Sequence, residues 1–158
     1  MEVFRKQKKL MGNQFEICII ADSQESAEEP IQIAIMEIQR IEKLLTTFSE
    51  SSQTNQINQN AGIKPVQVDQ ELIELIKRAN RISEITQGAF DLSYGSIDKS
   101  LWNFDVSMTS LPSAETARKS VRLINYKNIL LNEKNSTVFL KEKGMRIGFG
   151  GIGKGYAA

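Results

Sequence analysis

The stretch GMRIGFGGIGKGYAA, residues 144–158, decides how the rest of the chain is interpreted. Apolar residues alternate with Arg and Gly over 145–149, which predicts a short strand with one buried face. Four glycines and Lys154 follow, and the last three residues resemble the first turn of a helix. A strand, a glycine loop and a helix start together expose backbone N–H groups to an anion. The stretch therefore predicts a phosphate-binding loop to which Lys154 adds a positive charge.

Two interpretations of this loop stay open from its own residues. GFGGIGKG, residues 148–155, matches the front of a P-loop, G-x-x-x-x-G-K. Gly155 stands where a P-loop has the Ser or Thr hydroxyl that holds Mg²⁺. The alternative is a tight strand-to-helix turn with a solvated lysine.

The composition limits the classes of function. The chain has 158 residues, 41% of them apolar, and a net charge of +1. It is long enough for one domain with a hydrophobic core. Its nearly neutral net charge does not indicate binding to nucleic acid or to a membrane surface. No apolar run is long enough to cross a bilayer, and the first ten residues lack the apolar centre of a signal peptide.

The chain contains no histidine, which excludes Ser-His-Asp and Cys-His catalysis and histidine metal sites. A general base must be a carboxylate, a lysine or a metal-activated group. The single cysteine, Cys18, excludes an internal disulfide. It lies in the strand-like run FEICIIA, and we expect a buried structural thiol.

The order of elements predicts an α+β fold with a largely antiparallel sheet and packed helices, forming a single domain over residues 1–158. Strands over 3–10 and 14–21 form a hairpin, and three strands follow at 128–131, 137–141 and 145–149. Helices are expected over 26–45, from an N-cap at Asp69 to a C′ glycine at Gly88, and over 114–124 after an N-cap at Ser113. The polar stretch 44–62 is predicted as a loop, either a mobile surface loop or a polar rim over a pocket.

Apolar stripes define the buried helix faces. They consist of Ile31, Ile35, Ile38, Ile41 and Leu45 in the first helix; Leu72, Leu75 or Ile76, Ala79, Ile82 and Ile85 in the second; and Ala117, Val121 and Ile124 in the third.

Five stretches, in this order and spacing, resemble one family. They are MGNQFEI from Met11, IEKLLTTFSESSQTNQIN from Ile41, ISEITQGAFDLSYGSI from Ile82, LWNFD from Leu101 and GMRIGFGGIGKGYAA from Gly144. Together they resemble the N-terminal half of an ApbE-type flavin transferase, FAD:protein FMN transferase. The resemblance implies a fold related to the T-fold.

The resemblance also implies a reaction. Members of this bacterial family use Mg²⁺ to cleave the pyrophosphate of FAD, and transfer FMN to a threonine hydroxyl of a target flavoprotein. Some hydrolyse FAD to FMN and AMP instead. Members typically act in the cell envelope. Such phosphoryl transfer depends on positioning and charge neutralisation and needs no histidine.

Carried over residue by residue, the resemblance implies a binding site. Met11 would contact the flavin nucleotide, Phe48 would lie beside it, and Ala89, Phe90 and Asp91 of GAFD would bind FAD. The carbonyl of Gly151 would bind the metal, and Lys154 would lie near the pyrophosphate. The alternatives are that Met11 and Phe48 are core residues and that Asp91 is a turn residue.

The chain departs from the family pattern at three positions. Gly148 replaces an Asp that is expected to bind FAD, Asn13 replaces a Thr, and Gly153 replaces an Ala. Asp98 and Asp105 match no family role and are predicted as surface or capping residues, and Trp102 as core.

The family continues for roughly as many residues again, and its later part carries Asp and Thr ligands of the metal. We therefore expect a fragment that alone binds Mg²⁺ weakly, transfers no FMN and self-associates, and whose missing C-terminal half would restore activity. A P-loop-like nucleotide hydrolase and a non-catalytic flavin-binding or partner-binding domain are the competing functions.

Overall fold

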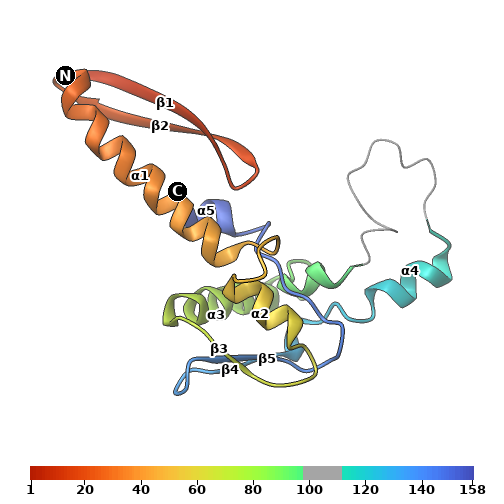
Figure 1. Cartoon of the computed structure of the whole chain (residues 1–158). Coiled ribbons are helices and arrows are strands. Elements are labelled where there is room, and N and C mark those ends of the chain that lie inside the picture. The colour runs from red at the N-terminus through yellow and green to blue at the C-terminus, as the bar shows by residue number, and fades with distance from the viewer. Residues whose placement is uncertain (98–111) are drawn as a thin grey trace. The chain divides into compact units, whose positions relative to one another are not determined.

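The computed structural model describes residues 1–97 and 112–158, which form two compact units (Figure 1). The first unit contains Met1–Leu45 and Ile152–Ala158, and the second contains Thr46–Gly151. The single domain over 1–158 stays a prediction. Asp98, Trp102 and Asp105, for which the sequence analysis makes predictions, lie outside the described residues. None of the helices in the described part is both long and apolar enough to cross a membrane.

A β-hairpin opens the first unit, as predicted. Strands β1 (Glu2–Leu10) and β2 (Asn13–Ala21) pair antiparallel along their whole length. Met11 and Gly12 form the connection with φ values of 50° and 74°. A two-residue turn with both central residues left-handed matches the twist of the strands. Gly12 adopts this conformation at no steric cost, whereas in Met11 the Cβ atom makes the same conformation unfavourable.

Helix α1 (Gln24–Leu45) packs along one face of this hairpin. Its predicted apolar stripe is buried throughout. Ala27, Ile31 and Ile35 form a cluster against which Ile17 and Ile19 of β2 pack. The short helix α5 (Gly153–Ala157) lies against α1 in the same unit (Figure 1).

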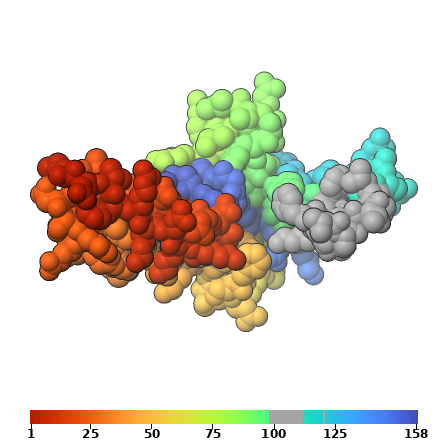
Figure 2. Space-filling view, turned by 90° about the horizontal axis from the view of Figure 1, so that it is seen from above, coloured from red at the N-terminus to blue at the C-terminus, as the bar shows by residue number. Residues whose placement is uncertain are grey.

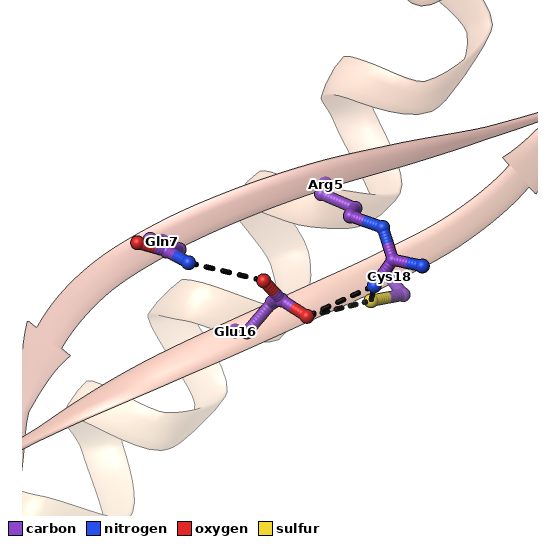
Figure 3. A network of polar contacts seen from close by, with 4 residues as sticks. All are labelled: Arg5, Gln7, Glu16 and Cys18. Carbon is purple, nitrogen blue, oxygen red and sulfur yellow. Dashed lines mark hydrogen bonds and ion pairs between the residues drawn. The ribbon is translucent and has the colours of Figure 1, made fainter.

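Cys18 is exposed, so the prediction of a buried thiol is wrong. Ile17 and Ile19 point toward α1, and a residue between them on a strand must point the other way. The side chains of Arg5, Gln7, Glu16 and Cys18 meet on this outer face (Figure 3). The hairpin lies at the surface in Figure 2, where its atoms are red to orange.

The second unit is built around a small antiparallel sheet in the order β3-β5-β4. Its strands are β3 (Val66–Gln67), β5 (Thr137–Leu140) and β4 (Ile129–Asn132). Its helices are α2 (Gln53–Gln59), α3 (Gln70–Ile85), η1 (Leu92–Ser96), α4 (Ala114–Val121) and η2 (Tyr126–Asn128). Every strand pair among the described residues is antiparallel, which does not match the parallel βαβ setting of a P-loop.

Helix α2 overturns the prediction of a loop over 44–62. Ser52 caps its N-terminus by accepting a hydrogen bond from the N–H of Asn55 at 3.0 Å. Ile57 anchors the helix in the core, and Thr54 and Asn58 are also buried. Polar residues that usually favour turns are helical here because one face of the helix is packed.

Helix α3 confirms the second predicted helix and its N-cap position at Asp69, but corrects its C-terminal end. Asp69 makes no side-chain cap bond. The left-handed C′ residue is Gln87, with φ 52°, and Gly88 follows it. Gln87 and Gly88 donate their N–H groups to the carbonyls of Glu84 and Ser83, which is a Schellman ending. Ile85, the last residue of the predicted buried stripe, is exposed, so the prediction is wrong at this position.

Helix α4 is shorter than predicted. Ser113 caps it as expected, through the N–H of Thr116 at 3.2 Å. The helix ends at Val121, which is 42% exposed and so does not form the expected buried stripe.

Candidate functional site

Residues 145–149 do not form the predicted strand. Met145, Ile147 and Phe149 are buried and Arg146 is exposed, so the alternation itself is confirmed. Within the described residues, however, this segment pairs with no strand. The pattern identified the buried face but not the partners of the backbone.

Side chains take the place of a neighbouring strand. Asn58 of α2 donates to the carbonyl of Ile147 at 3.0 Å and accepts from the N–H of the same residue at 2.7 Å. Ser96 of η1 bonds both backbone groups of Arg146, at 2.9 and 3.0 Å. The N–H of Gly148 donates to the carbonyl of Leu92. These contacts fix the segment that leads into the glycine loop.

The end of this loop meets the GAFD stretch. A Cβ atom built on Gly151 would lie 3.1 Å from Cε2 of Phe90, which is tighter than ordinary packing. The ring of Phe90 therefore lies directly against the Gly151 backbone. The fold thus brings together two of the predicted site residues that are far apart in the sequence.

The backbone of GAFD is held from α3. Thr86 donates its hydroxyl to the carbonyl of Ile82 at 2.8 Å and accepts from the N–H of Phe90 at 3.1 Å. The N–H of Ala89 donates to the carbonyl of Thr86. Ala89 is exposed and Phe90 is half-buried. The exposed part of the loop is therefore available to a ligand while its backbone is fixed.

Asp91 is the hub of a hydrogen-bond network. Its Oδ1 accepts from both the N–H and the hydroxyl of Ser93, at 2.8 and 2.6 Å. Its Oδ2 accepts from the N–H of Tyr126 at 2.8 Å, and the Ser93 hydroxyl accepts from the N–H of Asn125. Asp91 therefore caps η1 and connects it to the start of η2, which precedes β4. A carboxylate can accept further bonds, so this role does not conflict with FAD binding.

An open pocket of about 460 Å³ borders this network. Its wall consists of Glu84, Gln87, Gly88, Asp91, Ile124, Asn125, Tyr126 and Lys127. The ammonium of Lys127 lies 6.0 Å from the centre of the Tyr126 ring. The lining mixes one aromatic ring with charges of both signs, a polar surface rather than an apolar cavity.

The remaining predicted site residues lie in different parts of the chain. Phe48, in the second unit, is 90% exposed, so the alternative interpretation of Phe48 as a core residue is wrong. Met11, in the first unit, is half-buried in the hairpin turn, and the exposed Lys154 belongs to α5. The division between the units falls after Gly151, inside the glycine loop.

Asn58, Ser93 and Ser96 were not foreseen. Asn58 directly follows the apolar Ile57 in a stretch interpreted as a loop. A helical interpretation of residues 53–59 would have placed Ile57 and Asn58, three and four residues after Thr54, next to Thr54 on the helix surface. Ser93 and Ser96 follow GAFD in a segment without a periodic pattern, which left no signal for their partners.

The described residues do not complete a Mg²⁺ site. Across 1–97 and 112–158, no group of three or more Asp, Glu, Cys or His side chains could hold a metal. The carbonyl of Gly151 offers one hard oxygen ligand, whereas Mg²⁺ takes about six.

Sequence comparisons identify similar proteins. The FAD:protein FMN transferase of Klebsiella pneumoniae (strain 342) is 32% identical over 149 residues, which cover 94% of this chain and 46% of that protein. A protein of the same description from Treponema pallidum (strain Nichols) is 29% identical over 126 residues, covering 77% of this chain and 34% of its own length. The chain thus spans half or less of these curated relatives.

Solved structures have the same fold over half their length. The ApbE protein of Thermotoga maritima matches 99% of this chain and 50% of its own, with a TM-score of 0.86 and 28% identity. The flavin transferase ApbE of Vibrio cholerae also covers 99% of this chain and 50% of its own, with a TM-score of 0.80. At 18% identity, this second likeness shows the fold alone.

The mixed fold of helices and antiparallel sheet is therefore confirmed. The profile of the ApbE family matches residues 11–158, almost the whole sequence. The chain belongs to the ApbE family.

Proposed function

We propose that the protein carrying this chain transfers FMN from FAD to the hydroxyl of a threonine in a target flavoprotein. The hydroxyl oxygen attacks the phosphorus on the flavin side of the pyrophosphate and forms a phosphoester. The bond from that phosphorus to the bridging oxygen breaks, AMP leaves, and the hydroxyl proton passes to a base or to solvent. Attack by water instead would release FMN and AMP, which is the hydrolysis that competes with transfer.

One observation carries this proposal: the ring of Phe90 packs on the backbone of Gly151. The contact puts the GAFD stretch and the glycine loop at one place, which a ligand with both an aromatic ring system and a pyrophosphate requires. FAD is such a ligand. Ala89, Phe90 and Asp91 would bind it on one side, and Gly151 would approach the phosphates.

Three further residues have proposed roles. Met11 and Phe48 would contact the flavin nucleotide, and Lys154 would neutralise phosphate charge. Exposure of Phe48 and Lys154 is compatible with these roles.

The proposal includes dependence on Mg²⁺. Gly151 would provide one carbonyl ligand, and the other ligands would lie outside the described residues. Residues 1–158 alone should accordingly bind Mg²⁺ weakly, transfer no FMN and self-associate through exposed apolar side chains such as Ile33 and Met36. Size-exclusion chromatography of residues 1–158 over a range of concentrations measures the association.

The direct test is mass spectrometry of an acceptor flavoprotein domain incubated with the complete gene product, FAD and Mg²⁺. We expect the acceptor to gain one FMN phosphoester, and replacement of its threonine by valine to abolish the gain. EDTA should stop the reaction. FAD binding without FMN transfer or FAD cleavage would instead support the non-catalytic flavin-binding alternative.

Lys154→Ala tests the phosphate role. The variant should lose far more affinity for FAD than for riboflavin, because riboflavin carries no phosphate. Salt screens this attraction, so the difference between wild type and variant should shrink as ionic strength rises. Fluorescence titration of both ligands measures the effect, and an equal loss for both would make Lys154 structural.

A further inference from the structure

Two polar side chains hold the segment that enters the glycine loop, and they do so from opposite sides. In an extended chain, the N–H and C=O of one residue point to one side and those of the next residue to the other. Asn58 bonds both groups of Ile147, and Ser96 bonds both groups of Arg146. Segment 145–149 therefore lies between α2 and η1, bonded on each side.

This arrangement has a specific weakness that a β-ladder lacks. Each side of the segment depends on one side chain for its paired bonds. Asn58 is 6% exposed and Ile147 is fully buried, so water cannot replace a lost bond there. Leu92 adds a single bond, to Gly148. A change in either polar side chain should therefore loosen the segment directly before Gly150 and Gly151.

We propose that Asn58 and Ser96 are positioning residues for the glycine loop: they set where the Gly151 backbone lies against Phe90, without touching the substrate. The inference deepens the proposed function and rests on it for its catalytic consequence. A misplaced loop affects the reacting geometry more than it affects the remaining contacts to FAD. Loss of either side chain should therefore lower kcat for FMN transfer more than it raises KM for FAD.

Asn58→Asp is the sharpest variant because it preserves shape. The carboxylate can accept from the Ile147 N–H but cannot donate to its carbonyl, whereas a protonated carboxyl can do both. We expect kcat to fall roughly tenfold or more at neutral pH and to recover toward wild type at acid pH. Asn58→Leu should show the loss without the recovery. Gln59→Glu is the matched control, since it makes the same amide-to-carboxylate change at an exposed neighbouring position.

Hydrogen exchange in the complete gene product tests the positioning without substrate. The amides of 147–151 should exchange roughly tenfold or more faster in Asn58→Asp than in Gln59→Glu, with a smaller rise in Ser96→Ala. Ser96→Ala removes one hydroxyl and keeps the test available if the Asn58 variants fail to fold.

Three outcomes are decisive. Control-level exchange at 147–151 in both Asn58→Asp and Ser96→Ala would overturn the positioning role. Faster exchange with unchanged kcat would overturn its catalytic consequence. A wild-type protein that transfers no FMN would refute the proposed function, and the exchange measurement would still decide the positioning separately.

Discussion

Strand β2 and segment 145–149 have the same alternation of inward and outward side chains but are held in different ways. β2 pairs with β1 through backbone hydrogen bonds along its whole length. Segment 145–149 is held by Asn58, Ser96 and two backbone carbonyls, those of Glu142 and Leu92. Alternation therefore reports which face of an extended segment is buried, and does not report what its backbone bonds.

Burial differs between the two segments as well. The inward residues of β2, Phe15, Ile17 and Ile19, are only half-buried. Met145 and Ile147 are fully buried. The hairpin can rely on its ladder, whereas segment 145–149 must rely on packing and a few side-chain bonds.

The largest expected effect compares the packing of these two segments. Met145→Ala should lower the free energy of unfolding by about 2–5 kcal/mol, because it leaves a cavity in a closed core. Ile19→Ala should cost less than about 2 kcal/mol, because its site is partly solvated. Chemical denaturation of both variants measures the difference. Equal losses would mean that the hairpin depends on packing as much as segment 145–149 does.

Asp91→Asn tests how far the second unit depends on polar side chains. An amide can present an oxygen to Ser93 or to the N–H of Tyr126 but not to both, so we expect a loss of about 1–3 kcal/mol in stability. FAD affinity should fall as well, measured by flavin fluorescence. Ser93→Ala is the control, since it disturbs the network and keeps the carboxylate. If both variants lower the affinity for FAD equally, Asp91 has only a structural role.

Met11→Asn tests the turn of the hairpin. Asn adopts left-handed φ more readily than Met, so thermal unfolding should show a gain of about 1 kcal/mol. FAD affinity should fall, because the predicted flavin contact is removed. Gly12→Ala is the matched control for conformation alone: it meets no neighbouring atom, yet at φ +74° it should destabilise. Stabilisation with unchanged affinity would refute the role predicted for Met11.

The smallest effect concerns the outer face of the hairpin. Hydrogen bonds from Gln7, Arg5 and Cys18 hold the pKa of Glu16 below its ordinary value of 4.5. A lowered pKa contributes stability that is present above the ordinary value and is lost as pH falls through the folded value. The Tm difference between wild type and Glu16→Gln should therefore be present near neutral pH and vanish in acid. A difference that persists in acid would exclude this ionisation as its source.

Regular features of the fold were predictable from sequence. The hairpin, the stripe of α1 and the β4–β5 pair follow from local periodicity and turn residues, and all three are confirmed. The exposure of Cys18 could have been predicted in the same way, although a buried thiol was expected. Its position between the inward-facing Ile17 and Ile19 already places it on the opposite face of the strand.

The errors arose where distant contacts override local preference. Helix α2 is rich in residues that favour turns, and it is stable because Ile57 and Thr54 are buried. The partners of segment 145–149 lie 89 and 50 residues away, at Asn58 and Ser96. No local pattern specifies such pairs.

The candidate site was foreseen only as far as family motifs reach. The motifs identified Phe90 and Gly151, which the fold brings together. They gave no indication that Asp91 caps η1, because that role depends on the N–H groups of Ser93 and Tyr126. The functions of the individual site residues stay predictions.

The exposure of Cys18 has a practical consequence for spectroscopy. It is the single cysteine in these 158 residues, and it is exposed on the outer face of the hairpin. A thiol-reactive fluorophore or spin label would therefore attach to this chain at one defined position without any substitution. Such a probe would report on the mobility of the hairpin while FAD is titrated.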